Sequence, residues 1–504
     1  MKNKLNLYKG LTLGEAGRAI SIEKVNSENI YLRLQNDNQR RIIPTQLILD
    51  ILPHLRSKRI SIEDISRKYR SEHNKPNLFE ELNLDYEKYL LGYESTISKI
   101  CEYELTLNDN SFANELNFSP AILLPKSFIL LAGISGTGKS RFVREQASYF
   151  REDLSNYCLV PVRPDWHEPS DLLGYISRLG NKGARYVTTD FLRFIVAAWK
   201  NWIDNKDDTT PYWLCLDEMN LAPVEQYFAD YLSIIETREW DESGDYHCGA
   251  LLTSDLFEQL DDEGLHELKT SLGLTGREAL WEDFKKNGIA LPPNLIVAGT
   301  VNMDETTHGF SRKVIDRAFT LDFGEFFPNN YQDYFQATSR PKRLGFPTFS
   351  RVSIDVIANV SADADGTKSI AFLEAINSQL KGTPFELAYR ALNELLIAVV
   401  CFAPENDGQL QAVWDDFLMT KVLPRIEGDS EKLQDDGETS LLYKLETMLA
   451  GQFANIWADG LTRPDLLRES CDKCEWLAIQ CRSKKKLKWM QLRLTANGFT
   501  SFWP

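Results

Sequence analysis

The segment "SFILLAGISGTGKSRFVREQASYF" (residues 127–150) decides the fold, because three patterns follow one another in it without a gap. An apolar run has the length of a buried strand, a glycine-rich stretch follows it, and an amphipathic run begins directly afterwards. Glycines let the backbone turn sharply so that its N–H groups point inward at phosphate oxygens, and the next helix adds its positive N-terminal end. The sequence therefore predicts a phosphate-binding loop.

The side chains of this loop have the chemistry that a nucleoside triphosphate with Mg²⁺ needs. Lys139 is expected to reach the outer phosphates, and Ser140 to offer its hydroxyl to Mg²⁺, which prefers oxygen ligands and keeps most of its waters. The predicted nucleotide-binding residues of the loop are Gly133, Ser135, Gly136, Thr137, Gly138, Lys139 and Ser140. The predicted substrate is GTP or ATP.

Around this loop, apolar strands alternate with amphipathic helices, which is typical of a parallel sheet with helices on both faces. We expect an α/β core of five parallel strands at residues 127–133, 157–162, 212–217, 294–300 and 318–323. An acidic insertion occupies about 240–290, and the pattern beyond Phe326 is mostly helical. The predicted domains are 1–115, a nucleotide-hydrolysing core at 116–326 and a helical C-terminal lid at 327–504.

Polar residues follow two of the predicted strands. In "LCLDEMN", Asp217 and Glu218 come directly after an apolar run, where Asp217 can hold a Mg²⁺-bound water beside Ser140. Glu218 can orient and deprotonate the water that attacks the outermost phosphate. Asn302 ends "NLIVAGTVN", and its neutral amide can position that water without competing for Mg²⁺. Asp217 is therefore a predicted metal ligand, and Glu218 and Asn302 are predicted catalytic residues.

Two arginines complete the predicted site. Arg317 follows a short helix, at the place where a ring-forming NTPase presents an arginine to the nucleotide of its neighbour. An intramolecular ion pair, for example with Asp316 or Asp322, is the alternative, and Arg312 is the second candidate for the same role. Arg390, one turn into the helix "PFELAYRALNELLIAV", is predicted to contact the γ-phosphate within its own subunit, against the alternative of a surface arginine.

These segments together resemble the McrB-like group of AAA+ NTPases, whose founding member is the GTP-hydrolysing subunit of a modification-dependent DNA restriction system. The resemblance covers about residues 120–504 and rests on the quoted loop and on five further segments: "VRPDWHEPSDLLGY", "LCLDEMNLAPVEQYFADYLSIIE", "LPPNLIVAGTVNMDETTHGFSRKVIDRA", "DDFLMTKVLPRIEGD" and "GFTSFWP". It implies a nucleotide-dependent ring, commonly a hexamer, working with an McrC-like nuclease subunit that cuts DNA. The founding subunit reads Asn-Thr-Ala-Asp-Arg where this chain reads Asn302-Met303-Asp304-Glu305-Thr306, so the choice between GTP and ATP stays open.

The N-terminal segment differs in charge from the rest of this acidic chain, which has a net charge of -16. Residues 1–70 carry 14 Lys and Arg against 7 Asp and Glu, whereas residues 71–120 carry 3 against 10. Alternating residues from Arg18 predict a few strands with tight turns, followed by helices. The local positive charge makes this N-terminal α+β domain the candidate for binding DNA, modified DNA included, with a solvated face as the alternative.

A second function fits the same core. A remodelling chaperone of the related MoxR type would use the ring to reshape a protein partner, with the basic N-terminal domain as an adaptor. No window approaches the roughly 18 consecutive apolar residues of a membrane span, so we expect no membrane contact and a cytoplasmic location. Cys471, Cys474 and Cys481 are spaced like part of a metal site, but no second pair accompanies them, and idle thiols are favoured.

Overall fold

The computed structural model divides the chain into two compact units, Met1–Phe118 and Ser119–Pro504. This boundary lies three residues from the one predicted after residue 115. In the first unit the structure describes the backbone of residues 12–13, 20–25, 29–34 and 40–44. In the second it describes residues 121–503, apart from 180–182, 206–207, 242–243, 304–309, 332–334, 336, 434–439 and 472–475.

The described part of the first unit is a four-stranded antiparallel sheet in the order β1-β2-β3-β4. Its strands are Thr12–Leu13, Ile20–Val25, Asn29–Leu34 and Arg40–Pro44. The strands predicted from Arg18 onward are confirmed, while the helices predicted to follow them lie outside the described residues.

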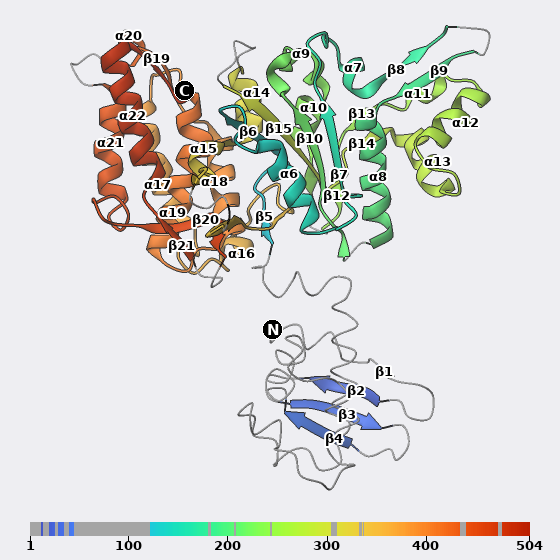
Figure 1. Cartoon of the computed structure of the whole chain (residues 1–504), viewed down its shortest axis with the longest axis horizontal. Helices are drawn as coiled ribbons and strands as arrows, with labels where there is room; N and C mark the ends of the chain where they lie inside the picture. Colours follow the sequence, from blue (N-terminus) through green and yellow to red (C-terminus); the bar gives the residue numbers. More distant parts are fainter. Residues whose placement is uncertain are drawn as a thin grey trace. The chain divides into compact units, whose positions relative to one another are not determined.

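A five-stranded parallel sheet forms the centre of the second unit, as predicted (Figure 1). Its order is β16-β6-β15-β10-β7, and its strands are Phe319–Asp322, Phe128–Gly133, Leu295–Asn302, Tyr212–Asp217 and Tyr157–Pro161. Strand β15 is two residues longer at its carboxyl end than predicted, because Asn302 still pairs with Gly133. The carboxyl ends of β6, β15 and β10 therefore lie side by side.

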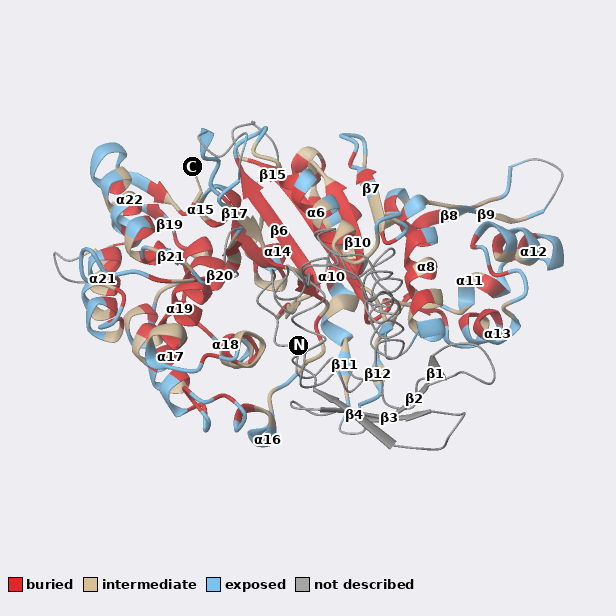
Figure 2. Cartoon of the chain, turned by 60° about the horizontal axis from the view of Figure 1, so that its bottom comes forward, coloured by how far each residue is buried: buried red, intermediate tan, exposed pale blue. Residues whose placement is uncertain are grey.

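The side chains of the central strands alternate between two hydrophobic cores, one on each face of the sheet. Phe128 and Leu130 belong to one core and Ile129 and Leu131 to the other, and all four are fully buried. Figure 2 shows the central strands as a continuous buried layer. Burial on both faces explains why these strands are apolar runs in the sequence rather than alternating ones.

Short helices and strands connect the central sheet. The helices before the insertion are α6 Lys139–Ser148, α7 Pro169–Leu173, α8 Asp190–Asn205, α9 Val224–Tyr227 and α10 Ala229–Ile234, with 3₁₀ turns η4 Met219–Leu221 and η5 Ile235–Thr237. The strands outside the central sheet are β5 Ile122–Leu123 and the antiparallel pair β8 Gly174–Ser177 and β9 Arg185–Thr188. After the insertion, α14 Arg312–Arg317 leads into β16.

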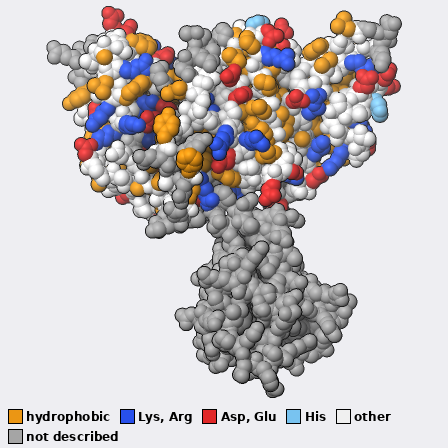
Figure 3. Space-filling view, in the orientation of Figure 1, with side chains coloured by type: hydrophobic (Ala, Val, Ile, Leu, Met, Phe, Trp, Pro, Cys, Tyr) orange, Lys and Arg blue, Asp and Glu red, His pale blue; other side chains and the backbone are white. Residues whose placement is uncertain are grey.

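The predicted acidic insertion folds as a small layer of its own. It contains β11 Glu239–Trp240, β12 Tyr246–His247, β13 Ala250–Leu252, α11 Asp255–Glu258, α12 Asp262–Ser271, α13 Glu278–Asn287 and β14 Ile289–Ala290. Arg185 of β9 makes ion pairs with Asp261, Glu263 and Glu267, at the N-terminal end of α12. Figure 3 shows acidic side chains gathered at this corner of the second unit.

The region beyond Phe326 is helical with additional strands, so the prediction of a mostly helical segment holds only in part. Its helices are α16 Ile354–Ile357, α17 Thr367–Leu380, α18 Tyr389–Phe402, α19 Asp407–Phe417, α20 Ser430–Leu433, α21 Leu441–Gln452 and α22 Arg482–Asn497, with η7 Leu418–Val422 and η8 Leu423–Arg425. Just before it, α15 spans Phe323–Phe326. Its strands are β17 Ser339–Pro341, β18 Leu344–Gly345, β19 Glu427–Asp429, β20 Arg463–Ser470, β21 Trp476–Ile479 and β22 Phe499–Ser501.

This C-terminal region shares one hydrophobic core with the sheet, so the boundary predicted at 326/327 falls inside a single compact unit. A buried ionic cluster reinforces it: Arg463 and Arg482 pair with Asp416, and Arg463 also pairs with Asp415. Lys486 of α22 pairs at 2.6 Å with Asp322, the last residue of β16. Among the described residues, none of the helices combines the length and the apolar character that crossing a bilayer requires.

Candidate nucleotide site

The predicted phosphate-binding loop lies between β6 and α6. Gly136 and Gly138 have φ angles of 77° and 92°, in the left-handed region that favours glycine. A Cβ added to either would meet nothing within 4 Å, so the backbone conformation, and not a lack of space, requires glycine there. The two residues turn the chain from the strand directly into the helix, and Gly138 is the residue that precedes its first turn.

The loop holds its own lysine inside the turn. Lys139 is buried, and its Nζ donates hydrogen bonds to the carbonyl oxygens of Gly133 at 3.1 Å and Ile134 at 2.7 Å. Thr137 Oγ1 donates to the same Ile134 carbonyl at 2.9 Å. The ammonium group is therefore held against the carbonyl oxygens of the loop.

Ser140 and Asp217 meet beside the loop although 77 positions separate them. Ser140 Oγ donates to Asp217 Oδ1 at 2.5 Å. Thr300 Oγ1 donates to the same carboxylate oxygen at 2.8 Å and accepts a hydrogen bond from the backbone N–H of Glu218 at 2.9 Å. Thr300 is therefore a member of the site that the sequence analysis missed, and its position two residues before Asn302 on the same strand was the available signal.

Glu218 and Asn302 are also brought together. Asn302 Nδ2 donates to Glu218 Oε1 at 3.2 Å, and the backbone carbonyl of Asn302 accepts a bond from Asn220 Nδ2 at 3.0 Å. Glu218 has φ 54° and ψ 50°, a left-handed conformation that costs a non-glycine residue on the order of 1–3 kcal/mol. Such strain persists only where the surroundings hold it, and here it aims the carboxylate at the amide of Asn302.

The donor set at Ser140 and Asp217 fits Mg²⁺. A hydroxyl and a carboxylate in contact are hard oxygen ligands, and Mg²⁺ is usually held by one or two protein groups together with water and substrate phosphates. Among the described residues no group of three or more His, Cys, Asp or Glu side chains could hold a metal ion. Ser140 and Asp217 would supply two ligands to a cation at this site, and water and phosphate oxygens could supply the others.

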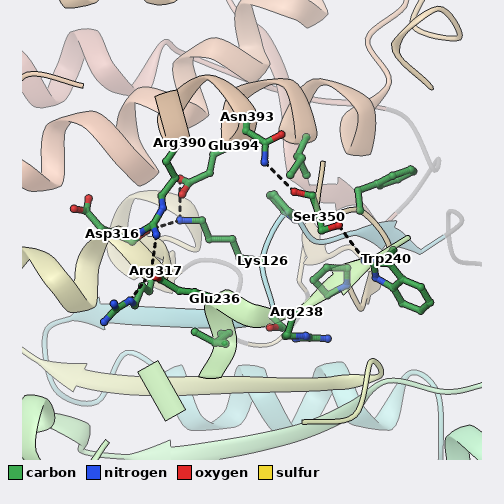
Figure 4. Close-up of a pocket in the computed structure, with 16 residues that line it drawn as sticks. Lys126, Glu236, Arg238, Trp240, Asp316, Arg317, Ser350, Arg390, Asn393 and Glu394 are labelled. Atoms are coloured by element: carbon green, nitrogen blue, oxygen red, sulfur yellow. Dashed lines mark hydrogen bonds and ion pairs between the residues drawn. The ribbon is translucent and has the colours of Figure 1, made fainter. Parts of the chain in front are cut away.

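The two predicted arginines lie elsewhere. Arg317 is the last residue of α14, and its Nε donates to Glu236 Oε1 at 2.5 Å. Arg390, in the first turn of α18, pairs with the same oxygen at 2.8 Å. Figure 4 shows both guanidinium groups directed at Glu236. The alternative of an intramolecular ion pair for Arg317 is therefore seen, but its partner is Glu236. The two partners suggested from the sequence pair with other cations, Asp316 with Lys421 and Arg425, and Asp322 with Lys486.

This arginine pair lines a pocket of about 200 Å³ next to Lys126 and Ser127, which precede β6. It thus lies at the amino end of the strand whose carboxyl end enters the phosphate loop. Arg390 was predicted to contact the γ-phosphate within its own subunit, which requires a position beside the phosphate loop. The structure places it instead at the other end of β6. Burial alone would raise the pKa of Glu236, but hydrogen bonds from Arg317 and Arg390 outweigh it and lower that pKa.

A second buried ionic cluster, separate from the one around Arg463, holds in place the two helices that carry Arg317 and Arg390. Lys126 and Lys421 each lie 2.9 Å from Glu394, which is one turn after Arg390 on α18. Both lysines also donate to the backbone carbonyl of Asp316, next to Arg317. Burial lowers the pKa of Lys126 to about 8 against the opposing effect of Glu394. The cluster fixes α14 and α18 relative to each other.

Arg312, the second candidate for the neighbour-facing role, is engaged differently. Its NH1 donates to the carbonyl of Pro384 at 2.9 Å, and its guanidinium lies 5.0 Å from the centroid of the Phe385 ring. These contacts tie the start of α14 to the segment before α18. Arg312 and Arg317 are both partly buried, and they differ in that the partner of Arg317 is a carboxylate.

The cysteines near the C-terminus show no metal arrangement in the described residues. Cys481 is buried, and its Sγ donates to Asp415 Oδ1 at 3.2 Å. Cys471 is exposed, and Cys474 lies outside the described residues. Cys481 belongs to the buried ionic cluster of the C-terminal region.

The family described as "Domain of unknown function (DUF8727)" matches residues 352–499. The match covers α16 to α22, and with them Arg390 and the buried ionic cluster around Arg463. It includes neither the phosphate loop nor the carboxylates of Asp217 and Glu218. No curated protein matches the chain.

Proposed function

We propose that this chain is a nucleotide-hydrolysing subunit of the AAA+ class, similar to McrB, that binds GTP or ATP with Mg²⁺ at residues 133–140. One observation carries the proposal: Ser140 bonds to Asp217 and Glu218 bonds to Asn302, at the adjoining carboxyl ends of β6, β10 and β15. A glycine-rich turn with an inward lysine lies at the same edge, where open parallel sheets bind their ligands.

The chemistry follows from these positions. Backbone N–H groups of the loop and the ammonium of Lys139 would bind the phosphates, and Ser140 and Asp217 would hold Mg²⁺, which neutralises charge on the phosphate oxygens. Asn302 orients a water molecule, and Glu218 accepts its proton as the water oxygen bonds to the γ-phosphorus. The bond from that phosphorus to the bridging oxygen breaks, releasing inorganic phosphate and the nucleoside diphosphate.

Hydrolysis is proposed to take place in a ring of identical subunits. Arg317 lies at the opposite end of β6 from the loop, so a nucleotide that it contacts would belong to a neighbouring copy. The resemblance to McrB-like proteins adds an McrC-like nuclease as partner and DNA as target. The excess of Lys and Arg in residues 1–70 supports DNA binding through the N-terminal unit, and a fluorescence anisotropy titration of labelled duplex over a salt series would test it.

A paired measurement of binding and turnover tests the proposed function. Glu218→Gln should bind GTP or ATP nearly as well as the unaltered chain and lose about 10²-fold or more in turnover, because a general base acts on water and not on phosphate. Lys139→Ala should lose binding itself. Glu258→Gln, at an exposed position on α11, is the matched control and should change neither quantity.

The two failures are distinct. Wild-type turnover by Glu218→Gln would remove it as the base. An unaltered chain that hydrolyses neither GTP nor ATP, with Mg²⁺ and at concentrations that allow assembly, would contradict the function as a whole. Glu258→Gln shows whether loss of a carboxylate by itself perturbs the protein.

A further inference from the structure

The shared contact of Arg317 and Arg390 with Glu236 is not explained by their separate predicted roles. The two arginines come from α14 and α18, 73 positions apart, and both reach the single oxygen Glu236 Oε1. Their side chains are 24% and 51% exposed, so the pair faces the surface. Two guanidinium groups repel each other unless an anion lies between them, and the Glu236 carboxylate is that anion.

The chain's own nucleotide lies out of reach of this pair. The pocket that the pair lines contains Lys126 and Ser127, at the amino end of β6, whereas the phosphate loop begins at Gly133. The six residues of β6 span roughly 20 Å at about 3.3 Å per residue. An arginine whose guanidinium bonds to Glu236 at one end of the strand does not also contact phosphates at the other end.

The neighbouring contacts keep both arginines at this surface. Lys126 and Lys421 bind Glu394 on α18 and the Asp316 carbonyl on α14, so the two helices present Arg390 and Arg317 as a unit. Arg238, another cation of the same pocket, is committed to Tyr246 and to the carbonyl of Pro293. Arg317 and Arg390 are held instead by a carboxylate that is itself 30% exposed.

We propose that Arg317 and Arg390 act together on the nucleotide bound by a neighbouring copy of this chain, and that Glu236 occupies the place of its phosphates in the separate chain. A carboxylate and a phosphate offer guanidinium groups the same kind of oxygen acceptors. The polyphosphate carries more charge than Glu236, so it displaces the carboxylate when two copies meet. Arg390 thus acts in trans, and Glu236 sets how readily the pair becomes available.

Mixing of variants tests this inference, which rests on the proposed function. Each site needs Glu218 from the chain that binds the nucleotide and, on this proposal, both arginines from its neighbour. Arg390→Ala and Glu218→Gln, each nearly inactive alone, should regain turnover when mixed, because some interfaces combine an intact base with an intact pair. Arg317→Ala mixed with Arg390→Ala should remain inactive, because neither chain carries the complete pair.

An arginine acting within its own chain gives the reverse pattern. In that case the mixture of Arg390→Ala with Glu218→Gln contains no site with both groups and stays inactive, whereas Arg317→Ala and Arg390→Ala rescue each other. Either of these results, or wild-type turnover by Arg390→Ala, would overturn the inference alone and leave the proposed function standing. A wild-type chain without any turnover would overturn both. Arg193→Ala, an exposed arginine on α8, is the control and should need no rescue.

Glu236→Gln tests the competing role of Glu236 through the concentration dependence of turnover, which loss of a purely structural contact would not shift in the predicted direction. Its amide keeps the shape of the side chain but attracts the arginines less, so the protein concentration at half-maximal turnover should fall about two- to tenfold. Thermal unfolding of the same variant shows whether the fold is kept. A half-maximal concentration that is unchanged or higher would remove the competing role from Glu236.

Discussion

Thr300→Val tests whether the hydroxyl of Thr300 holds Asp217 and Glu218 in position, because it leaves both carboxylates in the chain. The valine has nearly the same shape but no hydroxyl, so the hydrogen bonds to Asp217 Oδ1 and from the Glu218 N–H are both lost. Thr300 is 2% exposed, and water cannot replace the missing group without opening the strand. Asp217 keeps its bond from Ser140, whereas the Glu218 N–H loses its hydroxyl acceptor.

The expected magnitude follows from these contacts. A buried N–H left without an acceptor costs about 1–3 kcal/mol, and a lost bond to a carboxylate costs a similar amount, so the free energy of unfolding should fall by roughly 2–6 kcal/mol. The lost bond also helps hold Glu218 in its left-handed conformation. A displacement of about 1 Å at a reacting group can cost about 10²-fold, so turnover should fall about 10- to 100-fold at saturating nucleotide.

Thr300→Ser is the matched control, because it keeps the hydroxyl and removes only a methyl group. Phosphate release measured at 25 °C, together with urea unfolding of both variants, checks the prediction. The serine variant should retain turnover within about threefold of the unaltered chain. Valine turnover close to the wild-type value, or serine and valine variants that fall equally, would refute the reasoning that the hydroxyl positions the two carboxylates.

Further predictions concern the loop and the C-terminal region. Gly138→Ala forces a φ of 92° on a residue with a Cβ, so it should cost roughly 1–2 kcal/mol and weaken nucleotide binding, whereas Gly451→Ala, within α21 with open space around it, should not, as calorimetry can show. Arg463→Met takes from Asp415 its guanidinium partner in the buried cluster, while Asp416 keeps its pair with Arg482, and urea unfolding should show a loss of about 3–5 kcal/mol. Burial alone would raise the pKa of Asp415, but Arg463 and hydrogen bonds from residues 482 and 483 lower it. The ionised Asp415 should therefore stabilise the fold at pH 7, and this stabilisation should decline as the pH falls below about 4. Urea unfolding between pH 7 and 3 measures the decline.

The central sheet could be predicted because its evidence is local. The three inner strands β6, β10 and β15 are apolar runs buried on both faces, and the glycine-rich turn directly after β6 fixes the type of connection. The meeting of Asp217, Glu218 and Asn302 at one edge then follows from the rule that parallel strands align their carboxyl ends. Thr300 was missed because a threonine inside a strand is ordinary β-sheet composition, and only the register shows which carboxylate it contacts.

The position of Arg390 could not be predicted for a different reason. Its helix was recognised from its periodicity, but the periodicity of a helix does not determine which end of a distant sheet the helix approaches. That position depends on Glu394 bonding to Lys126 and Lys421, contacts between segments 268 and 27 positions apart. The strands of the C-terminal region were missed for a related reason. Strand β20 contains the buried charged residues Arg463, Asp465 and Glu469, so its sequence does not resemble an apolar run.

On the proposed function, the two ends of β6 carry complementary halves of one reaction. At its carboxyl end, Lys139, Ser140 and Asp217 form the proposed site for a polyphosphate, and at its amino end an arginine pair is held by a single carboxylate. Because a rigid, fully buried strand separates them, one chain does not bring its own two halves together. If the proposed function holds, a second copy has to supply the arginines, and turnover per subunit should rise with protein concentration until assembly is complete. Constant turnover per subunit down to concentrations at which the protein is monomeric would contradict this division of the site.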